Sequence, residues 1–458
     1  MTNPSLDAYQ QVFGLACLAD RAAQYNGNQA QLQQQLQYDL SYYFNNVPPV
    51  EIMNQTEPST ADPSIPPLLG NWNLVWGPAL IEETDEDGNP TGVADNALYV
   101  VQCDSVAFPG GPTIPAYVVA IAATNPSSLY DWETEDFSVS EIINWTTYNP
   151  SDFTPSAYNG SDPYISKGTA TGISILLNLT TVETAVSPNT TLEKFLTSLK
   201  PDPNTAIIFC GHSLAGALSP TLALYLKEHA LLDAFAFTLV YPTAGPTPGD
   251  ITFAERFNTT FPPLPEGWIL QSGDYQHWNT MHWNDLDVVP HAWANEDLQL
   301  IAKIYGASTD FFTGLKLDAL QKIAIDDGSK SGAPYTRIQN QPLPGTIQST
   351  YGSHSMNTPP QSLNDYFYQL ASQHTDLYTG TEDSNGNPLL HGLILPQPIP
   401  LPTTNNPLPL VPGVTKVTKD EMILKVINQI IDWILSHLVL SQQENSLRNA
   451  ETDEVQSF

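Results

Sequence analysis

Residues 207–216 read Ile-Ile-Phe-Cys-Gly-His-Ser-Leu-Ala-Gly, an apolar run that leads directly into a Gly-x-Ser turn. The next residues, 217–227, have the composition of a helix. A sharp turn between a strand and a helix pushes a serine hydroxyl out of the chain, and small neighbours let the backbone fold tightly around it. The stretch therefore makes Ser213 a candidate nucleophile. The alternative interpretation is a serine that only caps the following helix.

Apolar runs alternate with helical segments through the middle of the chain, which is typical of an α/β fold with a largely parallel sheet. Residues 5–44, which precede this alternation, are expected to be helical. The expected strands are residues 73–81, 97–103, 114–123, 205–210 and 234–241, and residues 268–271 and 280–283 are expected to supply one or two more. The expected helices between them are residues 169–182, 191–199 and 217–227.

Two proline-rich stretches separate a central domain from extensions at either end. The expected segments are an N-terminal helical segment with its proline-rich connector (residues 1–69), the α/β domain (70–390), a proline-rich linker (391–417), an amphipathic helix (418–443) and a disordered tail (444–458). The polar face of the amphipathic helix has few lysines or arginines. Docking on the domain is therefore favoured over lying on lipid or pairing with another chain.

The charge of the chain restricts its partners. The net charge is −33, from 15 Lys plus Arg against 48 Asp plus Glu, although only 14% of the residues are charged. Such a balance argues against nucleic acid and against an anionic membrane surface as partners. A neutral substrate fits better.

Neither a metal nor another cofactor is expected. His277 and His282 do not have the spacing of a known zinc site, and we interpret them as packing or cleft-lining residues. The 3 cysteines cannot form a disulfide framework. No signal peptide or membrane-spanning apolar run is visible, so a cytoplasmic location is expected unless the sequence is a processed form.

A nucleophilic serine needs a base and a carboxylate that orients this base. Asp287 enters an apolar turn after an expected strand, where a buried carboxylate can hold an imidazole in the useful tautomer; Asp285 is the alternative. His374 follows a short helical run and opens a polar loop, so it can reach back over the sheet edge. His354 is the alternative base.

Two backbone donors are needed for the oxyanion. One is the residue after the nucleophile, Leu214, and the other follows an earlier strand. Thr124 directly follows the run at 114–123 and could offer both its backbone N–H and its hydroxyl.

These motifs, in this order, resemble the fungal-type class 3 lipases, which have the α/β-hydrolase fold. In two places the chain differs from the family's motifs, since Ala122-Ala123 replaces Arg-Gly and Ala215 replaces a glycine. Pro220 inside the expected elbow helix should kink it or remove a hydrogen bond. The stretches that carry the resemblance are residues 119–124, 131–136, 211–217, 242–254, 287–290 and 373–378.

The resemblance implies a serine carboxylic ester hydrolase, most of all a triacylglycerol lipase that works through an acyl-enzyme. It assigns Ser213 as nucleophile, Asp287 as orienting acid and His374 as base, with Thr124 and Leu214 at the oxyanion. The aromatic stretch 125–165 would be a lid or substrate rim that contacts lipid, and its candidate residues are Tyr130, Trp132 and Phe137. The alternatives are a phospholipase A1, a soluble-ester or feruloyl-type esterase, an acyltransferase, and a non-catalytic lipase-like binding or signalling protein.

Overall fold

The computed structural model describes residues 6–44, 69–85, 87–123, 125, 138–382, 388–399, 410–418, 421–422 and 425. Several residues and segments predicted above lie outside the described residues. They are Thr124, Tyr130, Trp132, Phe137, the tail at 444–458 and almost all of the helix at 418–443.

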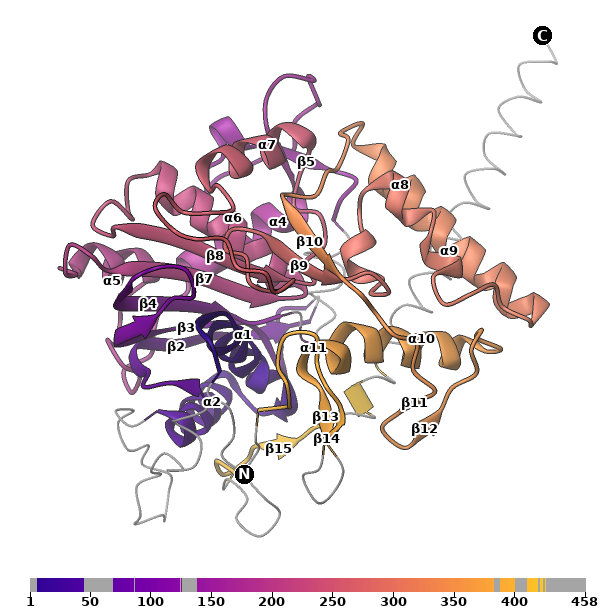
Figure 1. Cartoon of the computed structure of the whole chain (residues 1–458), viewed down its shortest axis with the longest axis horizontal. Helices are drawn as coiled ribbons and strands as arrows, with labels where there is room; N and C mark the ends of the chain where they lie inside the picture. Colours follow the sequence, from indigo (N-terminus) through magenta and orange to yellow (C-terminus); the bar gives the residue numbers. More distant parts are fainter. Residues whose placement is uncertain are drawn as a thin grey trace.

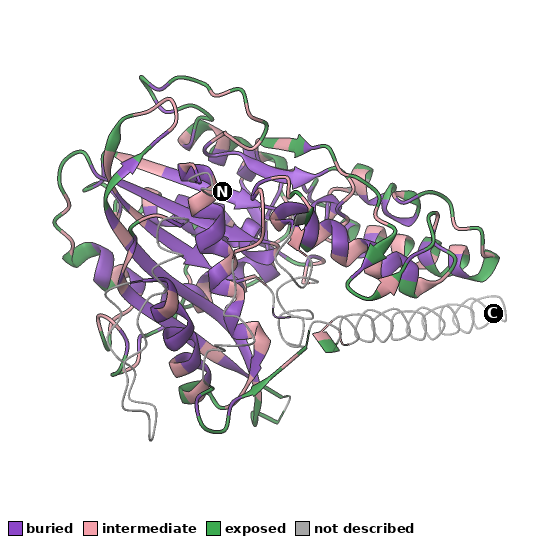
Figure 2. Cartoon of the chain, turned by 60° about the horizontal axis from the view of Figure 1, so that its bottom comes forward, coloured by how far each residue is buried: buried purple, intermediate pink, exposed green. Residues whose placement is uncertain are grey.

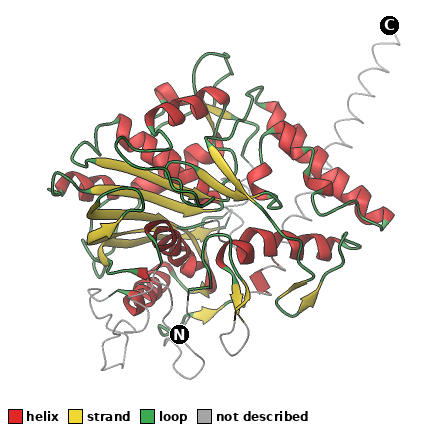
Figure 3. Cartoon of the chain, in the orientation of Figure 1, coloured by secondary structure: helices red, strands yellow, loops and turns green. Residues whose placement is uncertain are grey.

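Within the described residues, nine strands form one sheet in the order β10-β9-β8-β7-β4-β3-β1-β15, with β2 paired to β3 (Figures 1 and 3). Every neighbouring pair from β4 to β10 is parallel, whereas the pairs that involve β1, β2, β15 and the β3–β4 hairpin are antiparallel. The strands are β1 (Tyr25–Asn26), β2 (Asn73–Thr84), β3 (Pro90–Ala107), β4 (Thr113–Ile121), β7 (Ala206–His212), β8 (Phe237–Thr243), β9 (Met281–Asn284), β10 (Asn340–Leu343) and β15 (Thr415–Lys416). The predicted α/β fold with a largely parallel sheet is confirmed.

Helices cover both faces of this sheet, and successive strand residues point to opposite cores. On β7, Ile208 and Cys210 belong to the core under α1 and α2, whereas Ile207 and Phe209 belong to the core under α4 and α6. This alternation explains why the central strands are apolar throughout and buried (Figure 2). The helices are α1 (Ala8–Ala19), α2 (Gln29–Tyr43), α4 (Lys167–Asn178), α5 (Leu192–Ser198), α6 (Leu214–Glu228) and α7 (Ile251–Thr260).

The helical N-terminal segment is divided into two helices. Asp7 and Asn28 each form a capping box, and the two-residue strand β1 lies between α1 and α2. A buried ion pair joins the short 3-10 turn that follows α1 (Asp20–Gln24) to α2, with Arg21 Nη2 2.9 Å from Asp39 Oδ2.

A second helical region projects from the parallel side of the sheet (Figure 1). It packs around its own apolar cluster, which includes Leu317, Tyr351 and Tyr366. Its elements are α8 (Asn295–Leu298), α9 (Phe311–Lys330), the β11–β12 hairpin (Thr350–Tyr351 and His354–Ser355), α10 (Leu363–Ala371), a π-helical turn (Ser372–Asp376) and α11 (Leu377–Thr379).

Of the two stretches expected to supply one or two further strands, residues 281–284 form β9. Residues 268–271 form a loop, in which Trp268 packs on Phe108 and Phe237 while Ile269 and Leu270 are exposed. A backbone hydrogen bond from Ile269 N–H to the Gly110 carbonyl joins the loop to the turn between β3 and β4. None of the helices among the described residues combines the length and the hydropathy that a membrane-spanning helix needs.

Candidate active site

Ser213 occupies a strained turn between β7 and α6. Its φ of 58° and ψ of −130° are unusual for a residue with a side chain. The Ser213 side chain makes no capping hydrogen bond to α6, so the interpretation as a simple helix cap is wrong. The backbone turn itself is fixed by a bond from Ser213 N–H to the Thr243 carbonyl at 3.1 Å.

Small residues around the turn make this geometry possible. A Cβ on Gly211 would overlap Ala215, and a Cβ on Gly216 would overlap the Thr243 carbonyl and Gly245. The methyl group of Ala215 therefore fits because residue 211 has no side chain. Helix α6 continues through Pro220 without interruption.

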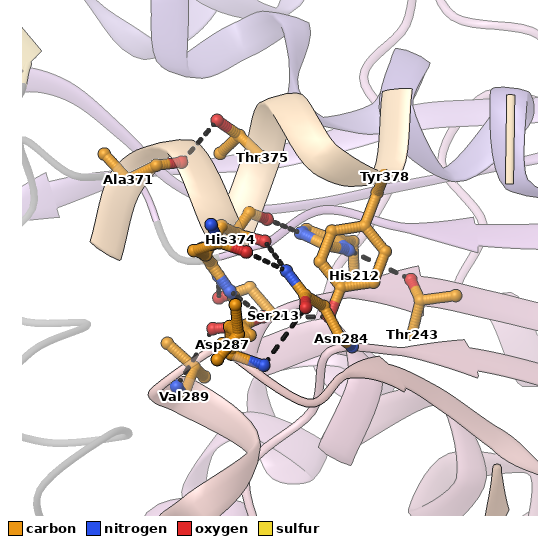
Figure 4. Close-up of polar contacts among 12 residues, drawn as sticks. His212, Ser213, Thr243, Asn284, Asp287, Val289, Ala371, His374, Thr375 and Tyr378 are labelled. Carbon is orange, nitrogen blue, oxygen red and sulfur yellow. Dashed lines mark hydrogen bonds and ion pairs between the residues drawn. The ribbon is translucent and has the colours of Figure 1, made fainter. Parts of the chain in front are cut away.

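The structure brings Ser213, His374 and Asp287 into one hydrogen-bonded chain (Figure 4). His374 Nε2 lies 2.8 Å from Ser213 Oγ, and His374 Nδ1 lies 2.8 Å from Asp287 Oδ2. Since a carboxylate accepts, His374 Nδ1 carries the hydrogen and donates it to Asp287. His374 Nε2 is then left with a lone pair that can accept the Ser213 proton.

Asp287 is completely buried in the loop after β9, where three donors surround its carboxylate. Val289 N–H donates to Oδ1 at 3.1 Å, while His374 and the Tyr378 hydroxyl donate to Oδ2. Burial, and then the charge of Asp287, raise the pKa of Tyr378 well above its ordinary value of 10.0. Tyr378 therefore stays protonated and donates to Asp287 at 2.9 Å.

His374 is held from its backbone by His212, the residue before Ser213. Burial and the neighbouring His374 lower the pKa of His212 from 6.5 to about 3, so its ring is neutral. His212 Nε2 lies 2.7 Å from the His374 carbonyl, and only a donor fits there. His212 Nδ1 then accepts from the Thr243 hydroxyl at 3.0 Å.

Asn284 holds the π-helical turn that contains His374. Its side-chain amide donates to the Gln373 carbonyl at 2.9 Å and to Gln373 Oε1 at 2.7 Å. Its backbone N–H donates to the Tyr378 hydroxyl at 2.7 Å. Single π-helical turns occur frequently at functional sites.

The alternatives considered from the sequence have other positions. Asp285 Oδ1 accepts from Gly345 N–H at 2.6 Å and belongs to a loop contact. His354 lies in the β11–β12 hairpin and stacks on Tyr368 of α10, with ring centroids 4.4 Å apart. The hydroxyl of Ser213 is contacted by His374.

Of the two predicted oxyanion donors, Leu214 is described and Thr124 is not. Leu214 is the first residue of α6, so its N–H has no acceptor four residues earlier within the helix. The amino end of a helix also favours a developing negative charge.

His282 is buried on β9 and His277 is partly exposed beside it, with ring centroids 6.1 Å apart. Among the described residues, no cluster of three or more His, Cys, Asp or Glu side chains could hold a metal ion.

Sequence reasoning did not assign His212 or Asn284 to the site. His212 could have been noticed because it adjoins Ser213. Nothing local marks Asn284, because its partner Gln373 lies 89 residues away in the chain. The Gln-His…Tyr motif did include Gln373 and Tyr378, although no role was assigned to either residue.

Comparison with known proteins gives a family match and similar solved structures. Residues 133–296 match the family described as lipase (class 3). The crystal structure of M37 lipase aligns with a TM-score of 0.55 at 24% identity, covering 81% of this chain and 92% of that chain. A search of curated protein sequences gave no match.

Two further lipase structures align less well and add no argument. The lipase of Rhizopus microsporus var. chinensis has a TM-score of 0.28 at 14% identity and covers 58% of this chain and 70% of its own. The triacylglyceride lipase of Rhizomucor miehei has a TM-score of 0.27 at 18% identity, and the alignment covers 47% of this chain and 60% of that chain. The family match confirms the resemblance predicted from the sequence and supports a carboxylic ester hydrolase, and the M37 lipase alignment confirms the α/β-hydrolase fold.

Proposed function

Starting from the class 3 lipase match over residues 133–296, we propose that this chain hydrolyses acyl esters through a covalent intermediate on Ser213. One observation carries the proposal. Three side chains from distant segments, with His374 161 residues from Ser213 and 87 from Asp287, form one chain of short hydrogen bonds. A structural role for Ser213 alone would not require this arrangement.

In acylation, Ser213 Oγ attacks the ester carbonyl carbon while His374 Nε2 takes its proton. Asp287 keeps His374 in the correct tautomer and stabilises the imidazolium that forms. The tetrahedral intermediate then collapses, and His374 returns the proton to the leaving alcohol. The acyl group remains on Ser213.

Deacylation repeats these steps with water. His374 removes a proton from water, the hydroxide attacks the acyl carbonyl, and Ser213 leaves with the proton. In both steps the Leu214 N–H stabilises the oxyanion, with Thr124 proposed as the second donor. His212 and Tyr378 make no contact with the reacting atoms in this scheme and act through His374 and Asp287.

We propose acylglycerols as the substrate class. The strong excess of acidic residues favours an uncharged ester over an anionic one. The candidate rim residues Tyr130, Trp132 and Phe137 would contact the acyl chains. Trp145, Tyr148 and Tyr164 of the same aromatic stretch are buried in the core and are not part of such a rim. A phospholipase A1 or a short-chain esterase would use the same three residues and differ only in which ester it hydrolyses.

The test is a series of p-nitrophenyl esters from acetate to palmitate, together with emulsified triolein. Ser213→Ala, His374→Ala and Asp287→Asn should each lower kcat by on the order of 10⁴- to 10⁶-fold. The matched control His354→Ala should retain activity, because Ser213 Oγ lies 2.8 Å from Nε2 of His374, whereas His354 stacks on Tyr368.

The outcomes separate the alternatives. Rates that rise with acyl length and include triolein support a triacylglycerol lipase. Activity confined to short esters or to phospholipids moves the assignment to an esterase or a phospholipase A1. Full activity in Ser213→Ala, or no hydrolysis of any ester by the native chain, contradicts the proposal, and the latter result favours a binding protein.

A further inference from the structure

The N-terminal helix α1 lies against the sheet directly behind the candidate site. Phe13 of α1 contacts His212 and Tyr378, with ring centroids 5.9 Å and 6.4 Å apart. Helix α1 ends at Ala19, and its carboxyl-terminal cap is Asp20. Asp20 is also the first residue of the short 3-10 turn that follows α1 (Asp20–Gln24).

Asp20 makes a long-range contact with the end of β4. Its Oδ1 accepts from Ala123 N–H at 2.7 Å, across 103 residues of sequence. The end of the sheet pairing explains this contact. The pairing of β4 with β7 ends at Ile121 and Gly211, where β7 turns into the elbow. Beyond that point Asp20 supplies the acceptor that a neighbouring strand would otherwise supply.

The contact lies next to the predicted oxyanion donor. Ala123 directly precedes Thr124, and on the other side the Asn125 side chain donates to the Ala94 carbonyl at 2.5 Å. The Ala122 N–H is bonded to the Ala97 carbonyl at 2.9 Å. Hydrogen bonds therefore hold the residues on both sides of Thr124 in place. For Ala123 the acceptor is the Asp20 carboxylate, and for Asn125 it is the Ala94 carbonyl.

The surroundings of Asp20 are mostly uncharged. Burial raises the pKa of Asp20 from 3.8 to about 7, against the opposing effects of the Ala123 N–H and of His374. Burial, with Asp20 itself contributing, also raises the pKa of Cys17 on α1, Cys210 on β7 and Tyr99 on β3, so these three groups stay neutral. A positive charge on His374 would favour ionised Asp20.

We propose that Asp20 is a positioning residue of the ester-hydrolysis site, which holds the peptide before Thr124 so that the oxyanion donor is in place. The inference rests on the proposed function for its effect on catalysis. The contact itself can be tested without catalysis. As the charged form is the stronger acceptor, ionised Asp20 holds the Ala123 N–H more firmly than the protonated form does.

The experiment compares Asp20→Ala, Asp20→Asn and the control Asp7→Asn, which alters the other cap of α1. The first readout is amide hydrogen exchange, measured by mass spectrometry on overlapping peptides that cover residues 116–125. Asp20→Ala should speed exchange at Ala123, whereas Asp20→Asn retains an oxygen acceptor and should restore most of the protection. Asp7→Asn should leave exchange there unchanged.

The second readout is the pH dependence of kcat and KM on p-nitrophenyl butyrate. Asp20→Ala should lower kcat by about ten- to a hundredfold with little change in KM, because a charge-assisted hydrogen bond is lost next to the oxyanion. In the native chain kcat should rise with pH through about 7 as Asp20 ionises, and Asp20→Asn should remove that ionisation from the profile.

These outcomes are distinct from those of the proposed function. If the native chain hydrolyses no ester but Asp20→Ala still speeds exchange at Ala123, the proposed function fails and the positioning contact stands. If Asp20→Ala does not fold, Asp20→Asn still decides through its pH profile. Unchanged exchange at Ala123 in Asp20→Ala, or a pH profile of Asp20→Asn identical to that of the native chain, overturns the inference.

Discussion

Replacing Tyr378 by phenylalanine should weaken both the fold and the site, because one buried hydroxyl serves two partners. It donates to Asp287 Oδ2 at 2.9 Å and accepts from the Asn284 N–H at 2.7 Å. Leaving a buried N–H unpaired costs about 1–3 kcal/mol, and a hydrogen bond to a charged group contributes about 1.5–3 kcal/mol. Since both effects come from one group, we expect the free energy of unfolding to fall by about 2–4 kcal/mol.

The effect on catalysis should be smaller than that of removing the acid. In Tyr378→Phe, Asp287 keeps two of its three donors, Val289 N–H and His374, so the tautomer of His374 is preserved. We expect kcat/KM for p-nitrophenyl butyrate to fall by about tenfold. Asp287→Asn, in contrast, should cost on the order of 10⁴-fold.

A matched control exists at Tyr305. Its hydroxyl is buried without a hydrogen-bond partner among the described residues, so Tyr305→Phe should leave the free energy of unfolding unchanged or raise it slightly. Urea unfolding and initial rates should be measured for both variants. If Tyr378→Phe matches Tyr305→Phe in both measurements, the hydroxyl does not support Asp287 and the reasoning is refuted.

Three further predictions concern the frame around the site. Gly216→Ala should strongly destabilise the fold in urea, because its Cβ would overlap the Thr243 carbonyl. The control Gly314→Ala in α9, where a Cβ would meet only Ser308 at 3.9 Å, should raise the free energy of unfolding by about 0.5–1 kcal/mol. Equal effects of the two substitutions would contradict the close approach of α6 to β8. Asp39→Ala should lower the free energy of unfolding by about 3–5 kcal/mol, because it leaves Arg21 buried without its partner, whereas breaking the exposed pair of Lys167 with Glu141 should cost less than about 1 kcal/mol. Burial lowers the pKa of both His212 and His282 from 6.5 to about 3, so the unfolded chain binds protons that the folded chain does not, and stability should fall as the pH drops from 6.5 towards 3. His282→Leu should reduce that loss in acid urea titrations, and a pH dependence identical to that of the native chain would contradict this assignment.

The elbow could be predicted from the sequence because its information is local. A buried strand, a Gly-x-Ser turn and a helix follow one another within 207–227, and the structure places β7 and α6 accordingly. The alternation of strands and helices likewise predicted the parallel part of the sheet. Of the two stretches expected to supply one or two further strands, only 281–284 does so, because exposed Ile269 and Leu270 have the composition of a strand but lie in a loop.

The choice between candidates within the site depended on tertiary structure. Asp285 and Asp287 are two residues apart, and only the turn after β9 decides which carboxylate faces His374. The sequence also predicted the N-terminal helices without their function. That Phe13 and Asp20 reach the back of the site follows from the packing of α1 under β7, which no local pattern encodes.

The most direct test of the account is covalent labelling with an alkyl p-nitrophenyl phosphonate, followed by mass spectrometry of the digested protein. The account predicts one adduct per chain, located on Ser213, with release of one equivalent of p-nitrophenol. Labelling should be much slower in His374→Ala, because the serine then lacks its base. An adduct on another residue, or ester hydrolysis that continues after Ser213 has been fully labelled, would contradict it.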